Sequence, residues 1–520
     1  MAWGAKPAQA AIRRRHRPLD GLAAAAAAPA GAAPARGVCK PSTRMSSLAR
    51  RALALFVVVA LSVLAVVTLF GGEAGRPPLQ PGAGAEADPL AYTEDREPQL
   101  AAAAARGHAH ILYAKSPGGA RTSAERTARF RTLVEAAART AGIEADTLEA
   151  MVLLESAGRP DAVADARLEG AVGLTQILAE TGRNLLGMTV DPKGAREIGR
   201  SLKRARREGD VALIARLTER RKRVDERFDP AKSLAATARY LLIARGELER
   251  EDLSVVSYHM GIGNLQGALR AYGEDDISYT RLYFDSTPLK HATAYEKLAA
   301  LGDDSSTYLW RVAAGREIMR LYREDPDQLD RISELQNNKN SAEEVLHPPD
   351  RTERFQTPAD VRAAYADGSL VALSRGDIRD SGLAIDRGMG ELAPRIGARL
   401  TTYRGLREPA LALLKYLGTG VQAISKVMPL RVTSSVCDER YQRLLVRRNR
   451  EATRRYSLHT TGWTFDILRS YQTRAQARAF EFMLQRLQSL NLIAWVREPA
   501  AIHVTVSSDA QRLVPRVGSP

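Results

Sequence analysis

Three short blocks in the first half of the chain bring together residue types suited to acid–base chemistry. Glu155-Ser156 closes the apolar stretch 148–154, the glycine-containing block 170–177 follows it, and the block 257–264 (SYHMGIGN) comes later. An apolar helix face makes an ionised carboxylate costly, so the pKa of Glu155 should rise, which suits a general acid. Most glutamates are solvated, and Glu155 alone would be interpreted as an exposed helix end. The two further blocks favour a catalytic site over an exposed helix end.

Helical periodicity surrounds these blocks from about residue 105 to residue 325. We expect helices over 125–141, 145–156, 234–249 and 308–322, and strand signals are nearly absent, so this part should be all-α. The segment 196–227 is dense in charge and is expected to be a solvated helical hairpin inserted on the surface. The alternative is a basic arm that touches anionic polymer or lipid head groups.

Taken in order, the blocks over residues 110–325 resemble those of the lytic transglycosylases of the goose-lysozyme-like, soluble-lytic-transglycosylase type. The family's Glu-Ser is matched by Glu155-Ser156, and its Gly-Leu-Met-Gln by Gly173-Leu174-Thr175-Gln176. Its Ala-Tyr-Asn-x-Gly-x-Gly is matched by Ser257–Gly263, in which His259 stands in place of Asn. Looser matches are the Pro-x-Ala turn at 160–162, Asp229-Pro230 and the Ala238–Leu241 helix segment.

This resemblance implies cleavage of the MurNAc-GlcNAc β-1,4 bond of peptidoglycan by a single carboxylate, carried over to Glu155. Glu155 would protonate the glycosidic oxygen and then accept the proton of the muramic C6 hydroxyl, giving a 1,6-anhydro product. Tyr258 would orient Glu155 or the substrate. The residues implied in substrate binding are Ser156, Gly173, Leu174, Gln176, His259 and Gly261. A two-carboxylate hydrolase needs a partner roughly 5–9.5 Å away, and the blocks offer no obvious one.

The last ninety residues have a different pattern, with β-branched runs at 430–434, 464–467 and 502–506 and a helix over 473–491 between them. This pattern predicts a small α+β domain. The segment Ser457–Asp466 (SLHTTGWTFD) resembles the Ser-x-His-x-x-Gly-x-Ala-x-Asp motif of zinc D-Ala-D-Ala carboxypeptidases and endopeptidases. The resemblance covers residues 430–507 and implies zinc as cofactor, held by His459, Asp466 and His503. Two His and one Asp leave a fourth position open for the attacking water.

The general base of that family stands three residues before the last His, where this chain has Ala500. Glu498 lies five residues before His503, and in a strand it would point to the same face as the missing base. Glu498 is therefore the candidate base. Three interpretations stay open for this domain: a working peptidase, an inactive metal-binding fold that grips stem peptide, and a structural remnant.

The formal charge of +16 is concentrated at the N-terminus, where residues 1–51 carry ten Lys/Arg and one Asp, a net +9 that leaves +7 for the remainder. A basic chain of this kind can bind nucleic acid, but no nucleic-acid-binding signature accompanies the charge, so that function class is set aside. Residues 52–70 are apolar and uncharged, and as a helix they would nearly span a bilayer core of about 30 Å. Arg50 and Arg51 precede them, which places the N-terminus in the cytoplasm and the bulk outside. A cleaved signal peptide, and a true start at Met45, stay open.

The expected organisation is multidomain: one N-terminal transmembrane helix, an all-α lysozyme-like domain and a small α+β zinc-peptidase-like domain. The boundaries are a basic cytoplasmic tail (1–51), the anchor (52–70), a flexible linker (71–105), the transglycosylase-like domain (106–335), a second linker (336–356), a helical region of unknown role (357–429) and the α+β domain (430–520). The expected protein is a single-pass inner-membrane enzyme whose bulk lies in the periplasm on peptidoglycan, with an envelope protein complex as a further partner. The alternative is a non-catalytic peptidoglycan-binding scaffold.

Overall fold

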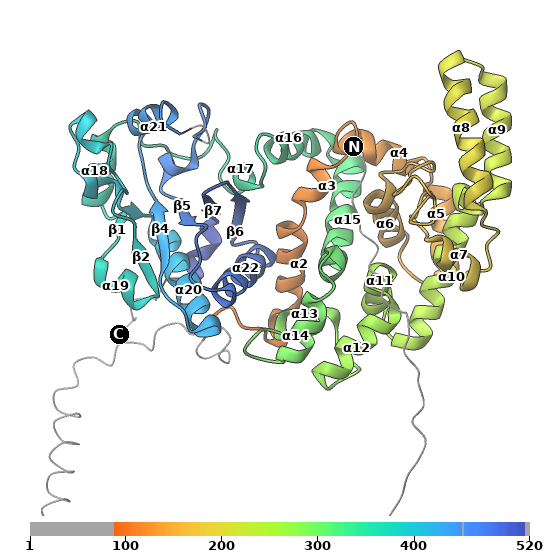
Figure 1. The fold of residues 1–520 in the computed structure, drawn as a ribbon, viewed down its shortest axis with the longest axis horizontal. Coiled ribbons are helices and arrows are strands. Elements are labelled where there is room, and N and C mark those ends of the chain that lie inside the picture. Colours follow the sequence, from red (N-terminus) through yellow and green to blue (C-terminus); the bar gives the residue numbers. More distant parts are fainter. Residues whose placement is uncertain (1–87, 450–451, 515–520) are drawn as a thin grey trace, which may run out of the picture. The chain divides into compact units, whose positions relative to one another are not determined.

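The computed structural model describes residues 88–449 and 452–514. The expected tail and anchor and about half of the first linker, residues 71–87, fall outside this range. Among the described residues no helix is both long and apolar enough to cross a membrane. The described chain is mostly helical with a small sheet near its C-terminal end, as the sequence predicts (Figure 1).

The first part of the fold is built from helices alone. Its helices are α2 (Glu97–Gly107), α3 (His110–Ala114), α4 (Ala120–Ala128), α5 (Arg131–Ala141), α6 (Ala145–Ser156), α7 (Ala179–Asn184), α8 (Pro192–Glu208), α9 (Val211–Val224), α10 (Pro230–Leu248), α11 (Glu251–Met260), α12 (Ile262–Tyr272), α13 (Tyr279–Asp285), α14 (Ala292–Ala299), α15 (Tyr308–Glu324) and α16 (Pro326–Asn337). The helix expected over 125–141 is divided into α4 and α5, which meet at residues 129–130.

Helix α6 lies in the interior because it is apolar on nearly every side. Residues 147–154 are all buried, and such a helix must be covered by neighbours on all faces. Its main neighbour is α15, where Gly315 allows close approach: a Cβ at Gly315 would lie 3.2 Å from that of Ala150. The one buried charge, Glu149, pairs with Arg131 at 2.9 Å and with Arg323. This packing fixes the end of α6, which carries Glu155.

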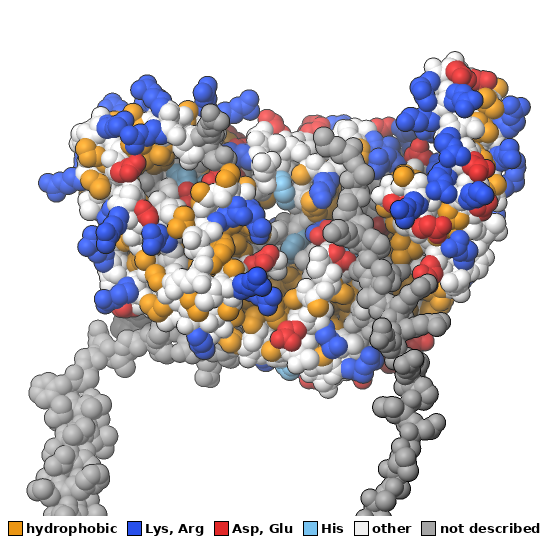
Figure 2. Space-filling view, in the orientation of Figure 1, with side chains coloured by type: hydrophobic (Ala, Val, Ile, Leu, Met, Phe, Trp, Pro, Cys, Tyr) orange, Lys and Arg blue, Asp and Glu red, His pale blue; other side chains and the backbone are white. Residues whose placement is uncertain are grey.

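The charged insertion forms the expected helical hairpin of α8 and α9, which lie side by side (Figure 1). Four of its apolar residues form a small cluster separate from the main core, Ile198, Leu202, Ala205 and Leu217. At its base Ala195 packs instead with Leu168, Val172 and Phe228. Lys and Arg side chains gather over its outer surface (Figure 2).

The second part contains a five-stranded sheet with the order β2-β4-β5-β7-β6. Its elements are α17 (Glu343–Leu346), α18 (Pro358–Ala366), β1 (Val371–Ala372), α19 (Arg375–Asp380), β2 (Leu383–Ile385), β3 (Gly405–Leu406), α20 (Glu408–Ser425), β4 (Leu430–Ser434), α21 (Glu439–Val446), β5 (Thr464–Leu468), α22 (Arg474–Ser489), β6 (Ile493–Arg497) and β7 (Ala501–Val506). Strand β2 pairs parallel to β4, and the other pairs are antiparallel.

Two features of this part differ from the sequence expectation. The region 357–429 was expected to be largely helical, and it does contain α18, α19 and α20, but it also supplies β2 at one edge of the sheet, so the sheet begins well before residue 430. The segment 336–356 was expected to be a linker, yet its helix α17 packs against β6 and β7. His347, which follows α17, bonds through Nε2 to the Val506 carbonyl oxygen at 2.6 Å and stacks on Trp463. One continuous hydrophobic core runs through both parts, from Leu90 to Leu513.

Candidate functional site

Glu155 lies at the buried end of α6 and is held by a tyrosine from α15. Its Oε1 accepts a hydrogen bond from the Tyr308 hydroxyl at 2.7 Å. Burial raises the pKa of Glu155 from its ordinary 4.5 to about 7, and the hydrogen bond from Tyr308 opposes that rise. A carboxyl group with this pKa can give up and recover a proton near neutral pH, as a general acid and base must.

Tyr258 is close enough to Glu155 to respond to its charge. Burial raises the pKa of Tyr258 and the Glu155 carboxylate raises it further, so the phenol keeps its proton. The hydroxyl donates to the Thr175 carbonyl oxygen at 2.7 Å and lies 3.3 Å from Thr237 Oγ1. Tyr258 therefore ties α11 to the block 170–177 beside Glu155.

The block 170–177 is a tight loop in which Gln176 has a left-handed backbone, with φ 54°. The Gln176 side chain donates through Nε2 to the Gly173 carbonyl oxygen at 2.9 Å. Gly173 has φ 84°, and a Cβ there would lie 1.8 Å from the Arg227 carbonyl oxygen, so no other residue fits without a backbone shift.

Two residues expected to bind substrate lie in the interior. Ser156 is 1% exposed, and its hydroxyl bonds to the Val152 carbonyl oxygen at 3.2 Å and accepts from the Arg159 backbone N–H at 3.3 Å. Leu174 is 0% exposed. Because both side chains are buried, neither is available to contact a bound sugar in this conformation.

His259 supports Glu155 through Tyr308 and makes no direct bond to it. Its ring stacks on Tyr308 at a centroid distance of 5.2 Å, and its Nδ1 lies 2.9 Å from Ser305 Oγ. Burial lowers the pKa of His259, so the ring is neutral at pH 7. Gly261, with φ 85°, makes the turn between α11 and α12.

A buried ion pair that the motifs did not reveal holds the loop in place. Arg227 and Asp225 are both 0% exposed and bond at 2.7 Å. The Arg227 guanidinium also donates to the carbonyl oxygens of Leu168, Gly170 and Ile177 at 2.7–3.1 Å. The sequence analysis missed both residues, because they lie at the end of the charged segment 196–227. No local pattern there distinguishes a buried arginine from a solvated one.

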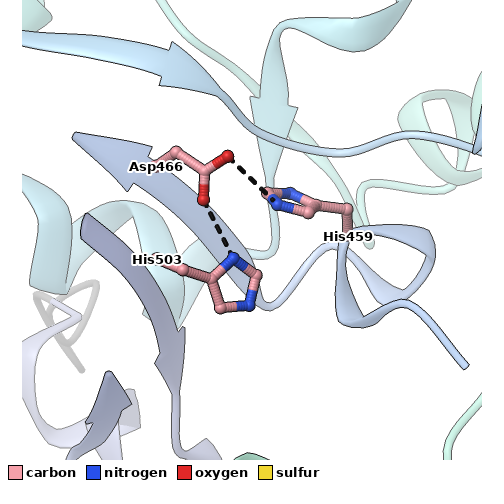
Figure 3. Close-up of side chains that lie close together, drawn as sticks. All are labelled: His459, Asp466 and His503. Atoms are coloured by element: carbon pink, nitrogen blue, oxygen red, sulfur yellow. Dashed lines mark hydrogen bonds and ion pairs between the residues drawn. The ribbon is translucent and has the colours of Figure 1, made fainter. Parts of the chain in front are cut away.

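A second cluster brings together the three predicted metal ligands (Figure 3). His459 lies on a short 3₁₀ helix, Asp466 on β5 and His503 directly opposite it on β7. The donor atoms of the three side chains all lie within 4.8 Å of one another. Asp466 joins the two rings: its Oδ1 lies 2.9 Å from His503 Nδ1 and its Oδ2 lies 3.4 Å from His459 Nε2.

The charge at this cluster is balanced by a further carboxylate, that of Glu343 on α17. Burial alone would lower the pKa of His503, but hydrogen bonds to Asp466 and Glu343 raise it to about 10. The pKa of Glu343 is lowered to about 2: burial opposes the shift, and the bond to His503 and the charges of His503 and Lys339 produce it. Glu343 was missed because it stands in a polar stretch that was expected to be a linker.

A cavity of about 980 Å³ opens onto the cluster and is lined by all four of these residues. Glu498 also lines it but does not lie on a strand, since β6 ends at Arg497 and β7 begins at Ala501. The strand alternation that pointed to Glu498 therefore does not apply, and its place at the cavity comes from the β6–β7 turn.

Compared with protein-family models and with curated proteins, the chain gives no match.

Proposed function

We propose that the chain is a peptidoglycan lytic transglycosylase with Glu155 as its only catalytic carboxylate. The observation that carries the proposal is the raised pKa of Glu155 beside Tyr308 and Tyr258. Among the described residues, burial and the Tyr308 bond account for the shift, with no second carboxylate contributing to it. A site of this kind is consistent with a reaction that uses one catalytic carboxylate.

In this mechanism protonated Glu155 gives its proton to the glycosidic oxygen as the C1–O bond breaks. The ionised Glu155 then takes the proton of the muramic C6 hydroxyl, whose oxygen bonds to C1 and closes the 1,6-anhydro ring. Substrate N-acetyl assistance removes the need for a second carboxylate. Tyr308 holds Glu155 in place throughout, and its hydrogen bond strengthens when Glu155 is ionised.

The His459, Asp466 and His503 cluster fits zinc by its donor set, two imidazoles and a carboxylate converging within 4.8 Å. Zinc in such a site lowers the pKa of a bound water and polarises a carbonyl group. The cavity beside it would hold a stem peptide, either for cleavage or for binding. The residues that line the cavity, Glu498 among them, would bind and orient that peptide.

We place the protein at the inner membrane, anchored by residues 52–70, with its bulk in the periplasm and peptidoglycan as its partner. The alternative is a peptidoglycan-binding scaffold without activity. Two observations favour that alternative: His259 is engaged with Ser305, and Ala500 replaces the family's base.

Digestion of purified sacculi followed by mass spectrometry of the muropeptides tests the proposal. We expect wild-type protein to release anhydro-muropeptides and Glu155→Gln to release none. An absence of products from folded wild-type protein would contradict the enzyme and support the scaffold. Metal analysis tests the second site, where His459→Ala should abolish zinc binding; unchanged zinc content would refute the metal centre.

A further inference from the structure

In both histidines of the second cluster, one ring nitrogen faces Asp466 and the other faces a second acceptor oxygen. The nitrogen that faces Asp466 is Nε2 in one ring and Nδ1 in the other. His459 points Nε2 toward Asp466, and its Nδ1 lies 2.7 Å from the Ser435 carbonyl oxygen. His503 points Nδ1 toward Asp466, and its Nε2 lies 3.0 Å from Glu343 Oε2 (Figure 3). A carbonyl oxygen and a carboxylate can only accept, so each of these outer nitrogens carries a proton.

A histidine that binds metal through one nitrogen usually donates its other N–H to a carboxylate or a carbonyl oxygen, which fixes the tautomer and the ring orientation. The outer contacts therefore leave His459 Nε2 and His503 Nδ1, which both face Asp466, as the nitrogens that can bind metal; a metal bound at His503 Nδ1 would take the place of the proton that this atom donates to Asp466. We propose that Glu343, supplied by the segment between the two parts of the fold, is the positioning residue that holds His503 for metal binding through Nδ1. This inference rests on the proposed metal centre.

Glu343 is itself held rigidly, as a positioning residue must be. It is 3% exposed, its Oε1 accepts from Lys339 Nζ at 2.6 Å, and its Oε2 also accepts from Thr505 Oγ1 at 3.3 Å. Lys339 lies just before α17, and Thr505 lies on β7 two residues beyond His503. The carboxylate is thus fixed from its own segment and from the sheet at the same time.

The position of Glu343 argues against a role as ligand or general base. It contacts the ring nitrogen that faces away from Asp466, whereas a ligand or base must reach the side where the three donor atoms converge. The cluster is therefore complete only when α17 is docked on β6 and β7. A segment that resembles a linker in the sequence becomes part of the metal site.

The test measures zinc affinity of the full-length protein by competition with a chromophoric chelator, and the visible spectrum of the cobalt-substituted protein. We expect Glu343→Gln to weaken zinc binding by roughly 10–100-fold and to alter the cobalt bands, because the imidazole loses its anionic partner. The matched control is Glu344→Gln: Glu344 is equally buried on α17 but bonds to Asn338 instead of His503. The control should bind zinc as wild type does.

A purely structural role predicts a different result, in which Glu343→Gln lowers the melting temperature and leaves zinc affinity and the cobalt spectrum unchanged. That result overturns the inference while the metal centre stands. If wild-type protein binds no zinc, the proposed metal centre fails and the inference fails with it.

Histidine-labelled NMR of the zinc-loaded wild type gives a test that needs no variant. We expect a retained N–H at Nε2 of His503 and at Nδ1 of His459. Metal binding through Nε2 on both rings would overturn the proposal.

Discussion

At the residue scale, the protonation of Glu155 links the proposed activity to the stability of the folded state. Its folded pKa of about 7 exceeds the ordinary 4.5, so the protonated form stabilises the folded state. This contribution is complete below about pH 4.5 and is lost as the pH rises through 7. Glu155→Gln has no such loss, so at pH 8 it should be more stable than wild type by up to about 3 kcal/mol. Urea unfolding of both proteins at pH 4 and pH 8 measures this, and an equal difference at both values would contradict it.

Tyr308→Phe tests the partner of the same carboxyl group. The Tyr308 hydrogen bond lowers the pKa of Glu155, so its removal should raise that pKa further. The activity of the variant on sacculi should therefore decline at a higher pH than that of wild type, with a lower maximal rate. The pH–rate profile measures both effects. Tyr272→Phe is the control, since Tyr272 donates to Asp285 and not to Glu155; the same shift there would show a general effect of lost hydroxyls.

At the element scale, the outer part of the α8–α9 hairpin should be dispensable for folding. The apolar residues of this outer part pack only with one another, and its ion pair from Arg206 to Asp161 is exposed and contributes little stability. Replacing residues 203–216 by a short glycine turn keeps Leu202 and Leu217 in place, and we expect the melting temperature to change by less than about 3 °C. Calorimetry measures this. A solvated hairpin predicts unchanged digestion of sacculi, whereas a salt-dependent loss of digestion would identify a basic arm.

Comparing the observed helices and strands with those expected shows which elements a local sequence pattern can predict. Strand β4 and the helical hairpin were predicted because alternation and helical periodicity are properties of neighbouring residues. Strand β2 was missed because its three residues gain their order from pairing with β4, far along the chain. Tyr308 and Glu343 were missed for the same reason. Each acts on a residue more than a hundred positions away, and no spacing within its own helix reveals that partner.

At the scale of the whole molecule, one core joins the helical part and the sheet. Residues from both parts belong to a single hydrophobic cluster, and partly buried hydrogen bonds such as that between Tyr283 and Ser489 at 2.8 Å cross between them. We therefore expect one cooperative unfolding transition by calorimetry. Zinc at about a hundred times its Kd should shift the whole transition, adding about 2.7 kcal/mol of stability. Two separate transitions, with only one shifted by zinc, would contradict the shared core.

In the proposed reaction Glu155 works without a second carboxylate, and the sugar's own hydroxyl replaces water. Digestion of sacculi in water enriched in heavy oxygen, with mass spectrometry of the released glycan ends, distinguishes that hydroxyl from water. We predict anhydro ends that carry no heavy oxygen, and no such ends from Glu155→Gln. Reducing ends that carry heavy oxygen at C1 would show hydrolysis by an activated water and would contradict the account.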